Sequence, residues 1–166
     1  MVKTSKLPED NVRAVGRVVV NFQYLEFTIV QLIWIMTGPD ENIGQRITAG
    51  VPFTKLCELL SSIFHYHIKD SSVVEKFEHL MTQARNVNTD RNRIVHSWWF
   101  TDLDGGAPSR LKPKAKGAQY DSENIDADAV STSISKLASD FEKFIDELYQ
   151  ANLIRRKPGI SLDSLR

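Results

Sequence analysis

Residues 15–36 read VGRVVVNFQYLEFTIVQLIWIM and contain the most apolar stretch of the chain. Apolar side chains recur there every three or four positions, which predicts an amphipathic α-helix. The pattern extends outward to Pro8 on one side and to Gly38-Pro39 on the other. We therefore expect a helix over residues 9–37.

This helix is apolar on nearly every side, because Val20, Tyr24 and Phe27 lie off its main stripe. A helix of this kind is buried on nearly every side. A single small bundle covers it poorly, so we expect a second subunit to pack against it.

Residues 18–36 are as long as a membrane span, but five polar residues interrupt them. These are Asn21, Gln23, Glu26, Thr28 and Gln31. Such groups are costly in lipid and ordinary in a buried helix. The polar residues 1–16 do not resemble a signal peptide, and one cysteine, Cys57, gives neither an internal disulfide nor a cysteine zinc cluster. We expect a cytoplasmic protein that does not bind a membrane.

Helical spacing dominates the remainder of the chain. We expect a short helix over 40–48 and long helices over 52–68, 73–96 and 126–152. Ser71-Ser72 offers a cap for the third long helix. Residues 97–120 differ, because three aromatic residues precede an Asp-Gly-Gly turn and a row of alternating basic residues, which predicts a β-hairpin.

The predicted fold is therefore all-α, a four-helix bundle of long antiparallel helices with a small β-hairpin inserted between the last two. We expect one domain over residues 1–154 and a flexible C-terminal tail over 155–166. Among the 166 residues, 21 basic and 21 acidic side chains give zero net charge, which excludes a protein that coats nucleic acid through bulk charge. A hydrophobic content of 42% excludes a disordered chain.

Arg91 stands where the stripe of the helix over 73–96 calls for an apolar residue, since Phe77, Ala84 and Arg91 are spaced by seven. A guanidinium cannot be neutralised, and burying it unpaired costs several kcal/mol. It needs a carboxylate, a phosphate or a wet cleft. Glu26, a charge near the apolar stripe of the first helix, is its expected partner.

Asn92 and His96 lie one helical turn apart and face the same way. Arg91 and His96 are about 140° apart around an ideal helix, so direct contact requires the arginine to swing or the helix to loosen near His96. Each residue alone also fits a structural role: Arg91 as an anchor for Glu26, Asn92 as an exposed amide, and His96 at a helix C-terminus.

Taken together, residues 91–96, Arg-Asn-Arg-Ile-Val-His, resemble the signature of the HEPN superfamily: an arginine, an adjacent polar residue, and a histidine late in a helix of an all-α bundle. The resemblance covers roughly residues 10–152 as architecture. The predicted hairpin over 97–120 is not part of the superfamily's common core.

The resemblance implies a metal-independent endoribonuclease without a cofactor. In this scheme the ribose 2′-hydroxyl attacks the adjacent phosphate and leaves a 2′,3′-cyclic phosphate. His96 is then the general base or acid, Arg91 holds the phosphate, and Asn92 orients His96 or a substrate oxygen. It also implies a homodimer with a composite site, a role as a toxin or phage-defence effector, and an antitoxin or activator as partner.

Two alternatives remain open. One is a non-catalytic HEPN-like module that binds a nucleotide, RNA or a protein; such members usually lack the arginine or the histidine, and this chain has both. The other is a purely structural helical dimerisation domain, which leaves Arg91 unexplained.

Outside residues 91–96, the sequence gives weaker indications of function. A row of cations in an extended strand shares one face and can track an RNA backbone, or can simply protect an edge strand. These cations are Arg110, Lys112, Lys114 and Lys116. We expect Trp98, Trp99 and Phe100 to be core residues rather than base-stacking ones. His65, His67 and His79 are expected to be surface or core-edge residues, without a metal.

Overall fold

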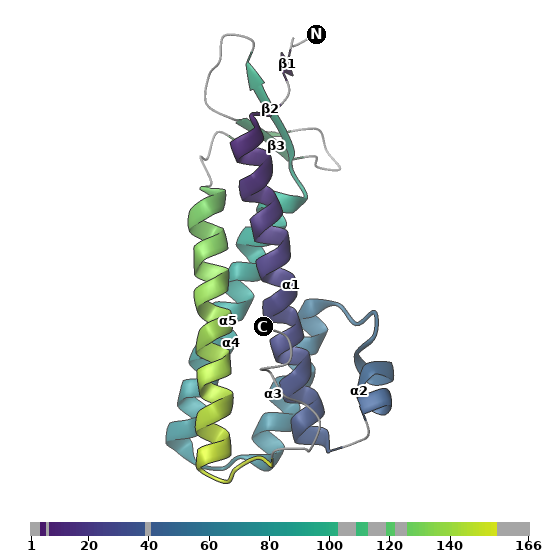
Figure 1. Cartoon of the computed structure of the whole chain (residues 1–166), viewed down its shortest axis with the longest axis vertical. Helices are drawn as coiled ribbons and strands as arrows, with labels where there is room; N and C mark the ends of the chain where they lie inside the picture. The colour runs from purple at the N-terminus through teal and green to yellow at the C-terminus, as the bar shows by residue number, and fades with distance from the viewer. Residues whose placement is uncertain are drawn as a thin grey trace. The chain divides into compact units, whose positions relative to one another are not determined.

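The computed structural model describes residues 4–5, 7–38, 41–102, 109–112, 119–121 and 126–155. These residues are mostly helical, in agreement with the all-α prediction. The helices are α1 (Glu9–Thr37), α2 (Glu41–Thr48), α3 (Phe53–His67), α4 (Ser71–Val95) and α5 (Ala127–Gln150) (Figure 1). Four short strands are β1 (Thr4–Ser5), β2 (Trp98–Asp102), β3 (Ser109–Lys112) and β4 (Gln119–Asp121).

The helix ends follow from local chemistry. α1 stops at Gly38, whose φ of +74° lies in the left-handed region that glycine adopts without strain. α4 begins at Ser71, and its cap is Asp70 rather than the predicted Ser71-Ser72. The Asp70 carboxylate accepts hydrogen bonds from the Ser72 hydroxyl and from the backbone N–H groups of Val73 and Ser72, and these bonds lower its pKa.

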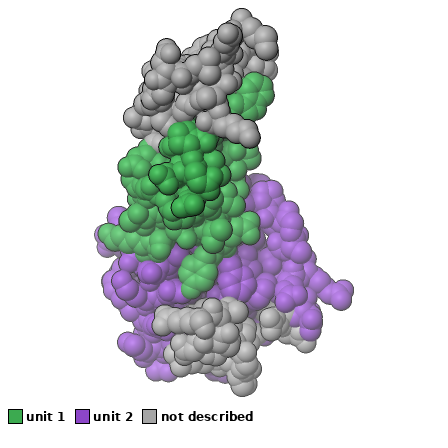
Figure 2. All heavy atoms as spheres, turned by 45° about the horizontal axis from the view of Figure 1, so that its top comes forward, with its two compact units in different colours: residues 1–24, 86–136 green, residues 25–85, 137–166 purple. Residues whose placement is uncertain are grey.

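The chain forms two compact units, each built from two separate stretches (Figure 2). Unit 1 comprises residues 1–24 and 86–136, and unit 2 comprises residues 25–85 and 137–166.

Unit 1 holds the sheet, whose strand order is β1-β2-β3-β4 with antiparallel pairing throughout. Trp98 pairs with Leu111, and Trp99 pairs with Arg110. The sequence predicts a two-stranded hairpin in this region, and β1 and β4 are strands beyond that prediction. Strands of two and three residues are too short to carry a periodic signal.

The helical part of unit 1 is joined by polar contacts as well as by its apolar core. Arg17 of α1 forms an ion pair with Asp128 of α5. One turn further along α1, the Asn21 side-chain amide donates to the Ser131 hydroxyl at 2.9 Å. These contacts fix the N-terminal half of α1 against the start of α5.

Unit 2 has an aromatic core in which Phe64 of α3 stacks on Phe77 of α4, with ring centroids 3.8 Å apart. Phe144 of α5 lies 5.8 Å from Phe64. The short α2 is held to α1 by Trp34, whose indole N–H donates to the Thr48 hydroxyl at 3.1 Å. Figure 1 shows α2 beside the end of α1.

The stripe of α1 is buried as predicted, and Val18, Phe22, Leu25 and Ile29 are at most 3% exposed. The prediction that α1 is buried on nearly every side is not met for the residues off the stripe. They remain exposed in the single chain: Val20 is 67% exposed, Tyr24 46% and Phe27 36%.

In the part of the chain that the structure describes, α1 is the one helix that meets the length and hydropathy of a membrane span, and half of its most apolar window is buried. The core helix of a soluble protein has the same properties, so this finding is weak evidence for a membrane.

Candidate functional site

The predicted motif residues lie at the C-terminal end of α4, within unit 1. α4 ends at Val95, and His96 is the first residue beyond it. Three donors follow the helix end: the His96 N–H donates to the Asn92 carbonyl, the Ser97 hydroxyl to that of Arg93, and the Trp99 indole to that of Ile94. These bonds satisfy three successive carbonyls that a helix end leaves without partners.

This helix end brings Arg91, Asn92 and His96 together. Arg91 Nη1 donates to Asn92 Oδ1 at 2.8 Å and lies 3.5 Å from His96 Nε2, the outer limit of a hydrogen bond. On a continuous helix the two side chains would lie about 140° apart. They approach at the helix end, where His96 is the first residue beyond α4 although its N–H still donates to the Asn92 carbonyl. Asn92 Nδ2 donates in turn to Asn88 Oδ1 at 3.4 Å.

The half-buried guanidinium of Arg91 lies over an aromatic face. Its Cζ is 5.0 Å from the centroid of Phe22 on α1, within the range of a cation–π interaction. Arg91 Nε is buried and donates to no acceptor in the described part of the chain. A buried donor without an acceptor is destabilising by about 1–3 kcal/mol, and a catalytic role or a bound ion is one explanation for such a group.

Glu26 and Arg91 belong to different units, and their pairing stays a prediction. Glu26 belongs to unit 2, where its charge acts on the Cys57 thiol. Burial raises the pKa of Cys57 to about 11; Arg85 lowers it, and Glu26 and Glu58 raise it further. A thiol with so high a pKa is a poor nucleophile, so Cys57 is a core residue.

The contact between Arg91 and His96 selects one form of the imidazole. A guanidinium donates hydrogen bonds and accepts none, so Nε2 must be the acceptor. The neutral form of His96 with its proton on Nδ1 meets this requirement. His96 is exposed, so a ligand from solvent can approach its imidazole beside the arginine.

The remaining predicted residues fall into several environments. Arg110 and Lys112 are in β3, and their side chains lie outside the described part of the structure, as do residues Lys114 and Lys116. Trp98 is 62% exposed, which contradicts the expectation that it is a core residue. Trp99 is half-buried, and the Phe100 side chain lies outside the described set.

The other three histidines, His65, His67 and His79, are exposed as predicted, and two of them contact polar groups. His65 Nε2 lies 3.3 Å from Glu78, and His79 Nε2 lies 2.6 Å from the Gln83 amide. Across the described ranges, no three histidine, cysteine, aspartate or glutamate side chains are grouped as a metal site requires.

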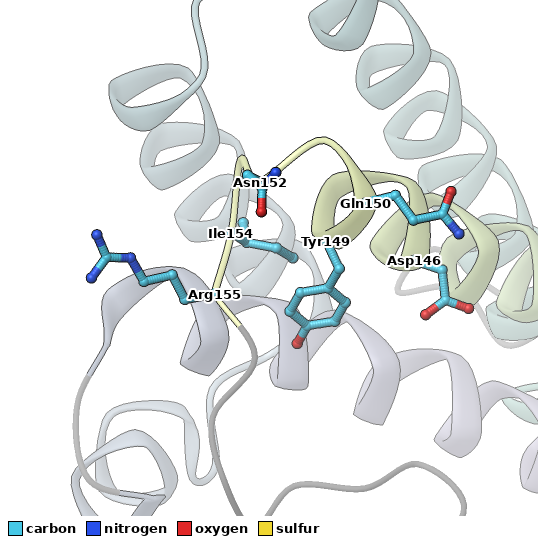
Figure 3. A pocket seen from close by; sticks show the side chains of 6 residues that line it. All are labelled: Asp146, Tyr149, Gln150, Asn152, Ile154 and Arg155. Atoms are coloured by element: carbon cyan, nitrogen blue, oxygen red, sulfur yellow. The ribbon is translucent and has the colours of Figure 1, made fainter.

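A pocket of about 750 Å³ lies in unit 2, around the end of α5. Figure 3 shows its lining residues, which are Asp146, Tyr149, Gln150, Asn152, Ile154 and Arg155. None of them belongs to the predicted site. Asn152 has a φ of +56° where the chain leaves the helix, a conformation that asparagine tolerates better than most residues.

A comparison of the chain with protein families, curated proteins and solved structures finds no match.

Proposed function

We propose that this protein is a HEPN-type, metal-independent endoribonuclease. The observation that carries the proposal is the contact of Arg91 Nη1 with both His96 Nε2 and Asn92 Oδ1 at the end of α4. A permanent cation beside a proton-exchanging imidazole is what cleavage at a phosphodiester needs. The proposal includes an all-α, four-helix-bundle domain; of the tail predicted over residues 155–166, all but Arg155 lies outside the described part of the structure.

The proposed reaction needs no co-reactant. Once the bound phosphate draws Arg91 Nη1 away from His96 Nε2, the freed Nε2 lone pair takes the proton of the ribose 2′-hydroxyl. The hydroxyl oxygen then forms a bond to the adjacent phosphorus. The bond from phosphorus to the 5′-oxygen breaks, and that oxygen leaves with a proton from a general acid. The products are a 2′,3′-cyclic phosphate and a 5′-hydroxyl end.

Arg91 stabilises the negative charge that develops on the phosphoryl oxygens. In the described residues its Nη1 alone makes hydrogen bonds, which leaves Nη2 for a phosphate oxygen. Asn92 holds the guanidinium through Oδ1 and is itself oriented by Asn88. A fixed, preoriented cation of this kind typically contributes more than a mobile one.

We further propose that the active form is a homodimer with a composite site, in which the second His96 supplies the general acid. The exposed Val20 and Tyr24 on α1 offer apolar surface for a second copy. Arg110, Lys112, Lys114 and Lys116 would attract the RNA backbone. The cellular setting is cytoplasmic, as a toxin or phage-defence effector that an antitoxin or an activator controls.

The test is incubation of the purified protein with mixed RNA in EDTA. We expect cleavage that leaves cyclic-phosphate ends in the wild type and its loss in His96→Ala. The matched control is His79→Ala, an exposed histidine of α4, which should cleave at the wild-type rate.

Two results would overturn the proposal. The first is equal cleavage by the wild type and by His96→Ala. The second is no cleavage by the wild type at concentrations where it is dimeric, even when cell extract is added as a source of activator. RNA binding without cleavage would favour the alternative of a non-catalytic HEPN-like module.

A further inference from the structure

The Arg91 guanidinium is directed by an aromatic ring as well as by hydrogen bonds. Its Cζ lies 5.0 Å from the centroid of Phe22, and its Nη1 donates to Asn92 Oδ1 at 2.8 Å. Its Nε meets no acceptor in the part of the chain that the structure describes. When the proposed reaction releases Nη1 from His96 Nε2, the ring and the Asn92 amide are the described contacts that still direct the guanidinium.

Phe22 itself is anchored in unit 1, to which Arg91 also belongs. Phe22 is only 3% exposed and lies in the buried stripe of α1. The residue before it, Asn21, donates to the Ser131 hydroxyl of α5 at 2.9 Å, which restrains α1 from turning at this point. A ring fixed in this way restricts the long arginine side chain, which otherwise samples many rotamers.

A ring holds an arginine without using up what the proposed reaction needs from it. In the described part of unit 1, the contacts of Arg91 are with Phe22, Asn92 and His96, and none of these is a carboxylate. A carboxylate would occupy N–H groups in a bidentate pair and offset the positive charge. A ring face attracts the cation through its quadrupole and leaves the N–H groups in the guanidinium plane to other acceptors. Since this attraction reaches to about 6 Å from the ring centroid, Arg91 can shift from His96 toward a phosphate and stay within it.

We propose that Phe22 is a positioning residue of the nuclease site, whose ring keeps the charged fork of Arg91 aimed at the scissile phosphate. This inference rests on the proposed function, because it takes the phosphate to be the ligand of Arg91. The ring is buried and acts only through the arginine. A weaker quadrupole at position 22 should therefore slow cleavage, even where the ring keeps its size.

The quadrupole can be weakened at nearly constant shape by replacing Phe22 with phenylalanine analogues that carry increasing numbers of ring fluorines. We expect kcat for cleavage of RNA in EDTA to fall stepwise along the series, in total about twofold to thirtyfold. KM should change little, because the phosphoryl charge that Arg91 meets is largest in the transition state. The matched control is the same series at Phe141 of α5, a buried ring of unit 2, where kcat should stay at the wild-type value.

A second readout does not depend on cleavage. The Arg91 Nε–H signal in NMR spectra, assigned by its loss in Arg91→Lys, reports through its proton exchange with water how firmly the guanidinium is held. We expect Phe22→Leu to speed this exchange, and Phe141→Leu to leave it at the wild-type rate.

The positioning proposal and the proposed function can fail separately. If the wild type cleaves RNA and kcat is constant along the Phe22 series, or falls equally along the Phe141 series, the positioning role is wrong and the nuclease stands. If no protein cleaves RNA, the nuclease is wrong, and the exchange rate alone decides whether Phe22 holds Arg91. Faster exchange in Phe22→Leu then supports that role of the ring, and an unchanged rate overturns it.

Discussion

Gly44 of α2 offers a sharp test of how unit 2 is packed. A Cβ built on this glycine would lie 2.7 Å from Cδ1 and 2.8 Å from Cγ of the Trp34 ring. Carbon atoms pack at about 3.5–4.0 Å, so Gly44→Ala must displace the ring by several tenths of an ångström. The ring is only 8% exposed, and its hydrogen bond to Thr48 restrains it.

Two effects of opposite sign determine the size of the change. Alanine in place of glycine inside a helix stabilises it by about 1 kcal/mol. Overpacking a buried side chain costs about 1–3 kcal/mol. We therefore expect Gly44→Ala to be neutral or destabilising by up to about 2 kcal/mol. At about 2–4 °C per kcal/mol for a chain of this size, Tm falls by up to about 8 °C.

The matched control is Gly16→Ala in α1, where a Cβ meets nothing within 4 Å. This variant gains the helical preference without the clash, so its Tm should rise. The assay is thermal unfolding followed by circular dichroism, with tryptophan fluorescence as a second probe of Trp34. If Gly44→Ala is stabilised as much as Gly16→Ala, then Trp34 does not pack on α2 in the way described.

Three further predictions concern single contacts. The cation–π contact between Arg91 and Phe22 can be tested by a double-mutant cycle of Phe22→Leu and Arg91→Met, measured by urea unfolding. We expect a coupling free energy of about 0.5–2 kcal/mol, and additive effects of the two substitutions would refute the contact. The pKa of the Cys57 thiol is raised from 9.0 to about 11, so the stability it contributes is complete below pH 9 and is lost as the pH rises toward 11. Urea midpoints of the wild type should therefore fall more steeply across that range than those of Cys57→Ala, and parallel curves would contradict the burial of this thiol. The pKa of Asp70 is lowered from 3.8, so its capping bonds stabilise the fold above that pH and lose their effect as the pH falls through the lower value. Asp70→Asn should show a shallower loss of stability between pH 5 and pH 2.5, and an unchanged slope would refute the ionised cap.

The helices could largely be predicted from the sequence, because each has a clear apolar period and a clear stop. The helix expected over residues 9–37 is α1, since Pro8 and Gly38 limit the pattern on both sides. The start of α4 was less predictable. Asp, Ser and Thr side chains all cap helices, and composition alone did not show that Asp70 would be chosen over the serines after it.

The site could be predicted in residue type and only partly in geometry. Arg91 was identified because a charge interrupts an apolar stripe. Its aromatic neighbour Phe22 was not identified, because a stripe residue has the same spacing whether it packs on a methyl group or on a guanidinium. The approach of His96 to Arg91 depends on where α4 ends, and helix ends are poorly defined by periodicity.

The pairing of β1 with β2 has a consequence for synthesis of the chain. Thr4 pairs with Asp102, so β1 leaves the ribosome without its partner β2, which follows nearly a hundred residues later. At about 5–20 residues per second, this delay is on the order of 5–20 s. Contacts of such long range close late in folding, because the loop between them must first be ordered. β1 therefore gains its neighbour, the strand that follows His96, only after helices α1 to α4 have been made.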